Sequence, residues 1–387
     1  MSTILHITMP AKARTGPPSQ QQLPSAHMSI HRILLTIFVI CIPYSATTYT
    51  TATQAQSVAV DSEKQTSTTA NTTQKLKVMT WNLEWFYDEN RNDNFSDLAK
   101  EKSSPNREAW DWRRDAIAKS IAAARPNIAA FQEVENRRVL WYLSRALQRN
   151  HKLSYFETGI EGRDFFTEQD VGYLNSAGVE VEKQTFYGFP PSLRDTDRYH
   201  SVTKHLETTI TISSGGTTYP VIIFNTHLRA REEAAEIRVK QARLIRHWIA
   251  AYLNEGADVI VLGDINTEHR GNSTSDPNTE IGVLCGAETN SVADDLIDLT
   301  RMLATSERGT HLLAGKEFDR ILCSRSLMHD DPDRLDLVFS KIENLRDLCI
   351  QGDVDTPEQH WEQYWEMAAD QRDLSDHLPI MATFELK

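Results

Sequence analysis

The sequence predicts an α/β fold in which two packed mixed sheets are flanked by helices. Strand-like apolar runs interleave with stretches of helical periodicity, and several neighbouring strand-like runs have no helix between them. A doubly wound parallel sheet needs a crossover, usually a helix, between parallel neighbours, so this pattern favours two mixed sheets instead. The chain has 387 residues, 40% of them hydrophobic, and is therefore long enough to bury a sizeable core.

The N-terminal extension, residues 1–55, has the pattern of a secretory signal peptide. Basic residues precede the apolar run 33–42, and small or polar residues follow it. A membrane-spanning helix needs about 20 apolar residues, so we expect no stable membrane anchor; a buried strand or helix is the alternative interpretation of the run. Met28 is a plausible true start. We expect the mature protein to begin between residues 46 and 57 and to be secreted or periplasmic.

The next segment, residues 56–75, is rich in Thr, Ser, Gln and Ala and lacks the apolar residues that a core needs. Its composition predicts a disordered linker. The texture changes near residue 75, and residues 76–387 are predicted to form the folded domain.

Within this domain the predicted elements follow one another without an internal repeat. The first strand ends at Asn82 and residues 89–107 are predicted to be a loop. Apolar residues at helical spacing predict helices over 108–125, 139–147 and 233–253, the first of them ended by Pro126. Further strands are predicted at 128–131, 170–175, 179–184, 206–213, 220–225, 258–262, 321–322, 335–339 and 380–384.

The composition argues against some classes of protein. The formal net charge is −13, and without residues 1–55 there are 38 basic against 54 acidic residues, or −16. Such a body has no global field that attracts nucleic acid, which argues against a DNA-packaging role. An enzyme acting on phosphate esters is not excluded, because a bound metal supplies local positive charge. The four cysteines allow at most one disulfide once Cys41 is removed, so no disulfide framework is expected.

Polar side chains stand at the ends of five strand-like runs. They are Asn82 and Glu84, Glu133, His227, Asp264 and Asn266, and Asp376 and His377. A single polar residue at such a place is usually a cap or turn residue. Five such places in one chain indicate a shared site, because strand ends are where open α/β sheets place their sites.

The residue types at these ends suit one chemistry. Oxygen ligands such as Glu133 and Asp376 favour Mg²⁺ or Mn²⁺. His227 and His377 can exchange protons near neutral pH. The sequence shows no Cys–His zinc spacing, no glycine-rich phosphate loop and no Ser or Cys nucleophile elbow. Water is therefore the expected nucleophile.

The motifs TWNLEW, FQEV, FNTHLRAR, GDIN, FDRILCS and SDHLPI occur in this order between residues 78 and 385. In this the chain resembles the exonuclease–endonuclease–phosphatase superfamily, in particular its deoxyribonuclease-like branch. The resemblance implies a four-layer α/β/β/α sandwich, a requirement for Mg²⁺ (or Mn²⁺), and attack of water on a phosphoester.

The resemblance also implies roles for individual residues. The metal ligands would be Asn82, Glu84, Glu133 and Asp376. The catalytic residues would be His227, Asp264, Asn266, Asp319 and His377. Asp319 would orient His377, although Asp336 could take its place, and Asp170 is a weak candidate for orienting His227. Arg229 and Arg231 could hold a phosphate or could pair with the glutamates that follow them, whereas Arg238 and Gln241 are expected to be structural.

These expectations describe an exported, divalent-metal-dependent phosphodiesterase, an endonuclease with DNA or RNA as its substrate and with no protein partner. The alternatives are the same chemistry on sphingomyelin or an inositol phosphate, and a non-catalytic binding module. Sphingomyelin-directed members would carry an exposed aromatic hairpin, and the sequence identifies none. Trp361 and Trp365, in the acidic stretch 353–373, are expected to anchor a lid by packing rather than to stack on bases.

Overall fold

The computed structural model describes residues 74–214, 217–268 and 273–387. The predicted signal peptide, 1–55, and almost all of the predicted linker, 56–75, lie outside these residues. In the described ranges no helix is long and apolar enough to cross a membrane. The three cysteines in those ranges, Cys285, Cys323 and Cys349, are buried and free.

Twelve strands in the described residues form two sheets of six. They are β1 (Lys75–Phe86), β2 (Ile128–Val134), β3 (Tyr155–Ile160), β4 (Asp170–Ser176), β5 (Val179–Thr185), β6 (His205–Ser214), β7 (Thr217–His227), β8 (Val259–Asp264), β9 (Leu296–Asp298), β10 (Asp319–Ser324), β11 (Leu337–Asn344) and β12 (Ile380–Leu386). The first sheet has the order β11-β12-β1-β2-β4-β3 and the second β5-β6-β7-β8-β10-β9. Each combines one parallel pair, β1 with β2 or β7 with β8, with antiparallel neighbours. The predicted mixed sheets are confirmed.

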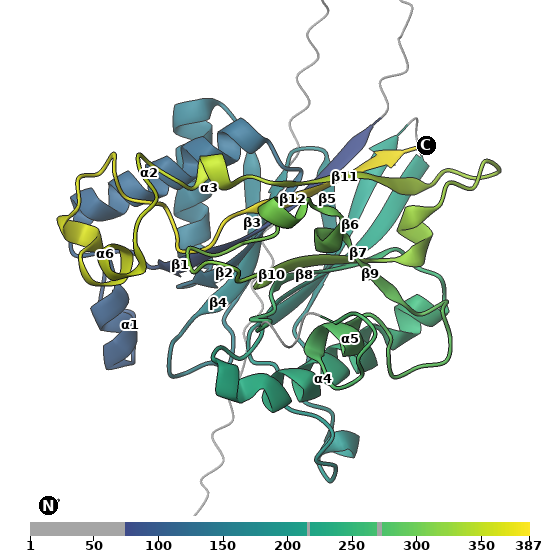
Figure 1. The fold of residues 1–387 in the computed structure, drawn as a ribbon. Coiled ribbons are helices and arrows are strands. Elements are labelled where there is room, and N and C mark those ends of the chain that lie inside the picture. Colours follow the sequence, from purple (N-terminus) through teal and green to yellow (C-terminus); the bar gives the residue numbers. More distant parts are fainter. Residues whose placement is uncertain (1–73, 215–216, 269–272) are drawn as a thin grey trace, which may run out of the picture. The chain divides into compact units, whose positions relative to one another are not determined.

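Helices cover the outer face of each sheet (Figure 1). The helices are α1 (Asp97–Lys102), α2 (Arg107–Ala124), α3 (Arg137–His151), α4 (Ala235–Asn254), α5 (Glu280–Leu284) and α6 (Pro357–Glu362). Helices α2 and α3 lie on the first sheet, and α4 and α5 lie on the second. The layers are therefore helix, sheet, sheet and helix, as expected.

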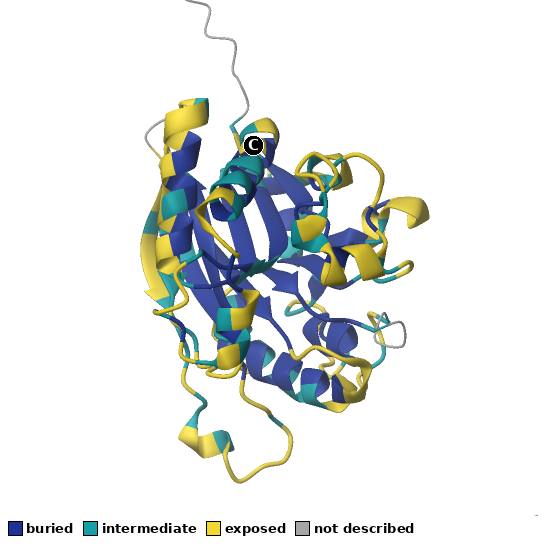
Figure 2. Ribbon diagram, turned by 90° about the vertical axis from the view of Figure 1, so that its left-hand side faces the viewer, coloured by how far each residue is buried: buried dark blue, intermediate teal, exposed yellow. Residues whose placement is uncertain are grey.

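Alternation along β1 shows how the sequence builds these layers. Leu76 and Val78 pack between the two sheets, whereas Met79 and Trp81 pack under α2 and α3. Successive side chains of a strand point to opposite faces, so an inner strand of such a sandwich is apolar on both. The inner strands are accordingly buried on both faces, while the edge strand β5 is largely exposed, as are the outer surfaces of the helices (Figure 2).

The register of the strands brings one set of ends together. The parallel strands β1 and β2 end at the same edge, and β12, antiparallel to β1, starts there. In the second sheet β7 and β8 end together and β10, antiparallel to β8, starts beside them. The segments that carry the predicted site residues therefore share one edge of the sandwich.

The elements that the sequence did not predict are short. The predicted loop 89–107 contains the six-residue α1, and β3, β9, α5 and α6 are also additions of three to six residues. Periodicity needs several repeats before it is visible, which such segments do not offer.

Candidate active site

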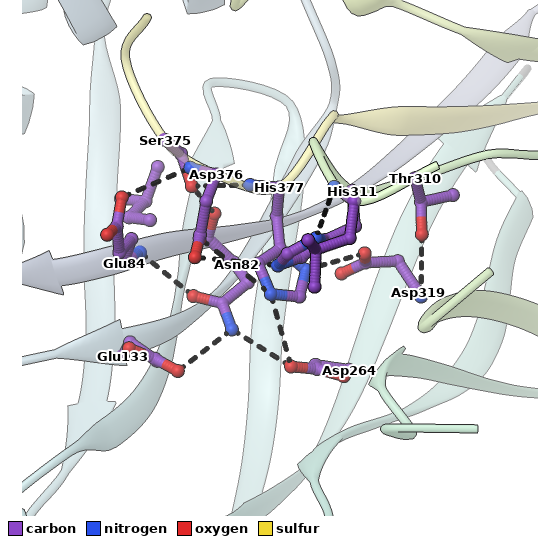
Figure 3. Close-up of polar contacts among 12 residues, drawn as sticks. Asn82, Glu84, Glu133, Asp264, Thr310, His311, Asp319, Ser375, Asp376 and His377 are labelled. Atoms are coloured by element: carbon purple, nitrogen blue, oxygen red, sulfur yellow. Dashed lines mark hydrogen bonds and ion pairs between the residues drawn. The ribbon is translucent and has the colours of Figure 1, made fainter. Parts of the chain in front are cut away.

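Asn82 joins the two sheets at the centre of this edge (Figure 3). Its amide nitrogen donates to Glu133 Oε1 at 3.1 Å and to Asp264 Oδ2 at 3.0 Å. Glu133 belongs to the first sheet and Asp264 to the second, and both Asn82 and Asp264 are buried. The amide thus fixes two carboxylates from different sheets in one cluster.

The backbone leaves regular strand geometry where these side chains are presented. Glu84, Glu133 and Asn266 have positive φ angles of 44°, 59° and 54°. The pairing of β1 with β2 shifts register between Asn82 and Phe86, and β2 shifts against β4 beside Glu133. Bulges of this kind re-aim side chains next to active sites.

His377 is held by a carboxylate on its Nδ1 side. Nδ1 lies 2.8 Å from Asp319 Oδ2, and Nε2 lies 3.7 Å from Asp264 Oδ2. Burial opposes a charge on this ring, but Asp319 and Asp264 outweigh it and raise the pKa of His377 well above its usual value. The charged form of His377 is therefore favoured beside the two carboxylates, and Asp319 holds the ring as expected from the sequence.

His227 has a different environment. Its Nε2 lies 3.5 Å from Asp264 Oδ2 and 3.8 Å from Glu133 Oε1. Its buried Nδ1 has no hydrogen-bond partner among the described residues. Burial, with a smaller effect of Lys204, lowers the pKa of His227 well below its usual value. The expectation that Asp170 orients this ring is wrong, because Asp170 accepts a hydrogen bond from the Gly162 amide instead.

Asp376 precedes His377 in the chain, and its Oδ1 lies 3.9 Å from His377 Nε2. Its Oδ2 accepts from Trp361 Nε1 at 3.0 Å and lies 3.5 Å from His311 Nε2. Burial works against ionisation, but His311 and His377 hold the pKa of Asp376 below its usual range. The ring centroids of His311 and His377 are 4.7 Å apart. His311 is thus a third histidine of the site, which sequence reasoning missed because it lies in a loop.

Glu84 on β1 contacts both His360 of α6 and the backbone of Asp376. Its Oε2 lies 2.5 Å from His360 Nε2 and accepts from the Asp376 amide at 3.1 Å. The other nitrogen of His360 lies 2.9 Å from Asp355 Oδ2. Sequence reasoning also missed His360, which lies in a six-residue helix and not at the end of a predicted strand.

The residues at this edge suit a hard divalent cation. Glu84, Glu133 and Asp376 line one cavity of about 400 Å³. Asp376 Oδ1 is buried and accepts no hydrogen bond from the described residues. Burial raises the pKa of Glu133 to about 7, and Asp376 adds to this effect. Carboxylate and amide oxygens gathered in this way are the donor set of Mg²⁺ or Mn²⁺. The four predicted metal ligands therefore lie together.

Gln169 and Lys204, which the sequence did not indicate, form a hydrogen-bonded chain that ends at Glu133. Its Oε2 accepts from Gln169 Nε2 and from the Trp85 amide. The side-chain oxygen of Gln169, Oε1, accepts a hydrogen bond from Lys204 Nζ at 2.7 Å. Lysine can only donate, so Lys204 fixes which end of Gln169 faces the carboxylate.

Asn266 shapes the loop after β8. Its amide nitrogen donates to the Leu228 carbonyl at 3.0 Å, and its backbone donates to Asp264 Oδ1 at 2.8 Å. Gly263 precedes this pair with φ at 130°, and a Cβ there would overlap the Thr226 carbonyl. Only glycine therefore lets β8 approach β7 at this point.

The basic residues after His227 divide into two kinds. Arg229 and Arg231 are exposed, and Arg231 pairs with Glu233 at 3.9 Å. Arg238 is buried, pairs with Glu280 at 3.1 Å and donates to the backbone of this loop, as expected of a structural residue. Gln241 likewise holds the Arg229 amide.

The choice between Asp319 and Asp336 is also settled. Asp319 contacts His377, whereas Asp336 accepts from the Asp331 amide and pairs with Arg334. A second carboxylate group, Asp88, Asp93 and Glu135, lies outside the site and is partly neutralised by Arg138.

Two mixed sheets between helices, with carboxylates and histidines gathered at one edge, define an α/β sandwich with a polar site at its strand ends. The chain belongs to the endonuclease/exonuclease/phosphatase family, whose model matches residues 79–377. No curated protein sequence matches it.

Solved structures share the fold at low sequence identity. A Bacteroides thetaiotaomicron protein of this family is 16% identical, with 81% of this chain and 99% of that chain covered and a TM-score of 0.50. The human Nocturnin catalytic domain is 14% identical over 81% and 95%, with a TM-score of 0.48. TDP2 from D. rerio, complexed with single strand DNA product, is 17% identical over 80% and 98%, with a TM-score of 0.46. At such identities the likeness concerns the fold alone.

Proposed function

We propose that this protein is an exported phosphodiesterase that depends on Mg²⁺ or Mn²⁺ and cleaves DNA or RNA internally. The observation that carries the proposal is the cluster in which Asn82 holds Glu133 and Asp264, both histidines approach Asp264, and Asp319 holds His377. A binding module has no use for two histidines converging on one buried carboxylate.

Each group in this cluster has a chemical task. Asp264 is fixed by Asn82 and by the Asn266 amide, so its carboxylate can orient a water for attack. The charged ring of His377 can stabilise the phosphate oxygens and protonate a leaving oxygen. His227, held neutral by burial, can donate or accept at the phosphate. A bound divalent cation would polarise the phosphate as a Lewis acid.

The test is a substrate panel of plasmid DNA, RNA, sphingomyelin and phosphoinositides, each with and without a chelator. We expect nicking and linearisation of the plasmid or cleavage of RNA, abolished by the chelator and restored by Mg²⁺ or Mn²⁺. Glu133→Gln should lose several orders of magnitude in rate while staying folded, since Lewis-acid stabilisation is on the order of several kcal/mol. Glu182→Gln on exposed β5 is the matched control. Full turnover in excess chelator contradicts the proposal.

Export needs a separate measurement. The apolar run 33–42 behind basic residues supports it. The intact mass of protein made in its natural host should correspond to a start between residues 46 and 57, in a fraction outside the cytoplasm. A full-length protein in the cytosol contradicts export and leaves the chemistry unaffected.

One observation favours phospholipid as a second candidate substrate. The loop between the paired strands β3 and β4 carries Phe165 and Phe166, 82% and 72% exposed. Phe95 is 88% exposed, and its amide donates to Glu168 of the same loop. An exposed aromatic hairpin, which the sequence did not reveal, is therefore present. Exposed apolar patches mark membrane or partner surfaces. Hydrolysis of sphingomyelin vesicles that is lost in Phe165→Ser/Phe166→Ser, without nucleic-acid cleavage, supports this candidate.

A further inference from the structure

A segment between β11 and β12 covers one side of the metal-ligand cluster. It contains α6 and a short 3-10 helix, Tyr364–Glu366. Glu84, Glu133 and Asp376 line a cavity of about 400 Å³, and residues 360–366 of this segment line the same cavity. These residues are therefore placed to contact a group that is attached to a phosphate at the cluster.

Four aromatic side chains line this cavity, and three of them already carry a cation. Lys102 lies 5.9 Å from the ring of Trp85, Arg113 5.3 Å from Tyr364, and Arg372 5.4 Å from Trp365. Trp365 also packs edge-on against Tyr364, which fits the packing role expected for it. The fourth ring, Trp361, has no cation over it among the described residues: it is tilted against the ring of His311, with the centroids 6.2 Å apart, and Trp361 remains 47% exposed.

Trp361 is anchored although its ring is open. Its Nε1 donates to Asp376 Oδ2 at 3.0 Å. The preceding residue, His360, is buried between Asp355 and Glu84, and a capping box of Thr356 and Gln359 begins the helix. The ring is thus held in place by a hydrogen bond to a predicted metal ligand, so Trp361 loses little conformational freedom when a planar group covers it.

We propose that Trp361 stacks on the base of a nucleotide whose phosphate is bound at the carboxylate–histidine cluster. The inference rests on the proposed nuclease function and assigns Trp361 to substrate binding rather than to packing alone. Stacking is sequence-tolerant, because every base has a π-face, so no base preference is expected. Glu101, Glu362 and Glu366 also line the cavity and outnumber its two cations, Lys102 and Arg113, which suits a neutral base better than a second phosphate at this place.

The test separates the ring of Trp361 from its N–H group. Trp361→Phe keeps an aromatic ring and loses the donor to Asp376, whereas Trp361→Gln keeps a donor and loses the ring. The substrates are single-stranded oligonucleotides that have either a normal base or a baseless sugar next to the single cleavable phosphodiester. For wild type and Trp361→Phe, kcat/KM should be about 5 to 150 times higher for the base-containing substrate than for the baseless one. This range follows from the usual strength of base stacking. Trp361→Gln should cleave both substrates equally.

Two controls isolate the effect of the Trp361 ring. Trp141→Gln on α3, where the side chain is 43% exposed, should keep the wild-type preference. The Mg²⁺ affinity of each variant, measured by calorimetry, reports whether the contact with Asp376 matters for the metal. It should be unchanged in Trp361→Gln if the new side chain still donates to Asp376.

The outcomes are distinct. If oligonucleotides are cleaved but Trp361→Gln keeps the preference for a base, stacking is overturned and the nuclease function stands. If plasmid DNA or RNA is cleaved but these oligonucleotides are not, stacking is overturned and the nuclease function stands. If none of these nucleic acids is cleaved, both proposals are overturned. If glycerophosphocholine is hydrolysed instead, with loss in Trp361→Gln and retention in Trp361→Phe, the ring binds a quaternary ammonium group and the base proposal is overturned.

Discussion

The Asp319 carboxylate decides the state of His377. It lies 2.8 Å from Nδ1 and is the largest of the charges that keep the ring protonated. In Asp319→Asn the ring loses its charged partner, so both its orientation and its cationic form become less favoured. We expect kcat to fall about 100-fold or more, the scale of general acid–base catalysis.

Asp336→Asn is the control for this experiment, because Asp336 is also a buried aspartate near a strand but pairs with Arg334. Its turnover per folded molecule should equal that of wild type. Thermal unfolding of the same samples separates lost catalysis from lost fold. An equal loss of turnover in both variants would mean that the contact with His377 is not what matters.

His205 predicts a pH-dependent stability outside the site. Its Nε2 accepts from the Tyr187 amide at 3.0 Å and its Nδ1 contacts the Val202 carbonyl at 2.9 Å, so the neutral ring is fixed. Burial lowers the pKa of His205 to about 3. The unfolded chain therefore binds a proton that the folded protein rejects. The contribution of His205 to the free energy of unfolding is therefore complete above the pKa of about 6.5 that histidine has in the unfolded chain. It is lost as the pH falls toward 3.

The measurement is urea unfolding at pH 7 and pH 5. His205 should account for a loss of about 2 kcal/mol in the free energy of unfolding between these values. His205→Gln, which can still accept from the Tyr187 amide, should be less stable at pH 7 but should lack this part of the pH dependence. Parallel curves for the two proteins would show that His205 is not the titrating group.

Among individual residues, those that stand at the end of a predicted strand could be identified from the sequence. Asn82, Glu133 and Asp264 each stand where an apolar run stops, so their convergence could be predicted. His311 and His360 come from a loop and a six-residue helix, and Lys204 acts through Gln169. Nothing local marks these residues, because only the folded chain brings them to the site.

Asn225 on β7 links the two sheets beneath the site. It accepts from Gln132 Nε2 at 2.7 Å and donates to the carbonyls of Phe131 and Gly172. Asn225→Leu leaves these buried groups without partners. We expect the free energy of unfolding to fall by about 1–3 kcal/mol, the cost of burying an unsatisfied polar group. Asn150→Leu on exposed α3 is the control, and equal urea midpoints for the two variants would contradict the bridge.

The elements themselves were predictable in proportion to their length. The helices α2, α3 and α4 span 15 to 20 residues and show their periodicity plainly. The order of strands was not predictable, because pairing depends on contacts far apart in sequence. Strand β12 pairs with β1, some 300 residues earlier, and that pairing places Asp376 and His377 beside Asn82.

The whole molecule is acidic and also gathers carboxylates at one edge. The net charge of −13 opposes the approach of a polyanion, so attraction has to come from the site itself. His377 supplies one positive charge there, and a divalent cation would supply two more. A nuclease built this way should depend on its metal for binding as well as for chemistry, with KM for DNA rising as the metal is withdrawn.

The same carboxylates make the stability of the whole domain depend on the metal. Burial and the nearby charge of Asp376 disfavour the ionised form of Glu133, so this carboxylate destabilises the metal-free fold. A cation that binds only the folded protein at 100 times its Kd adds about 2.7 kcal/mol to the free energy of unfolding. For a domain of this size that corresponds to a rise in Tm of about 4 °C. Glu133→Gln should abolish most of the rise in Tm on adding Mg²⁺, because it removes a carboxylate ligand of the cation. If Glu133→Gln still shows the full rise, the cation binds elsewhere, and Asp88, Asp93 and Glu135 are then the group to substitute next.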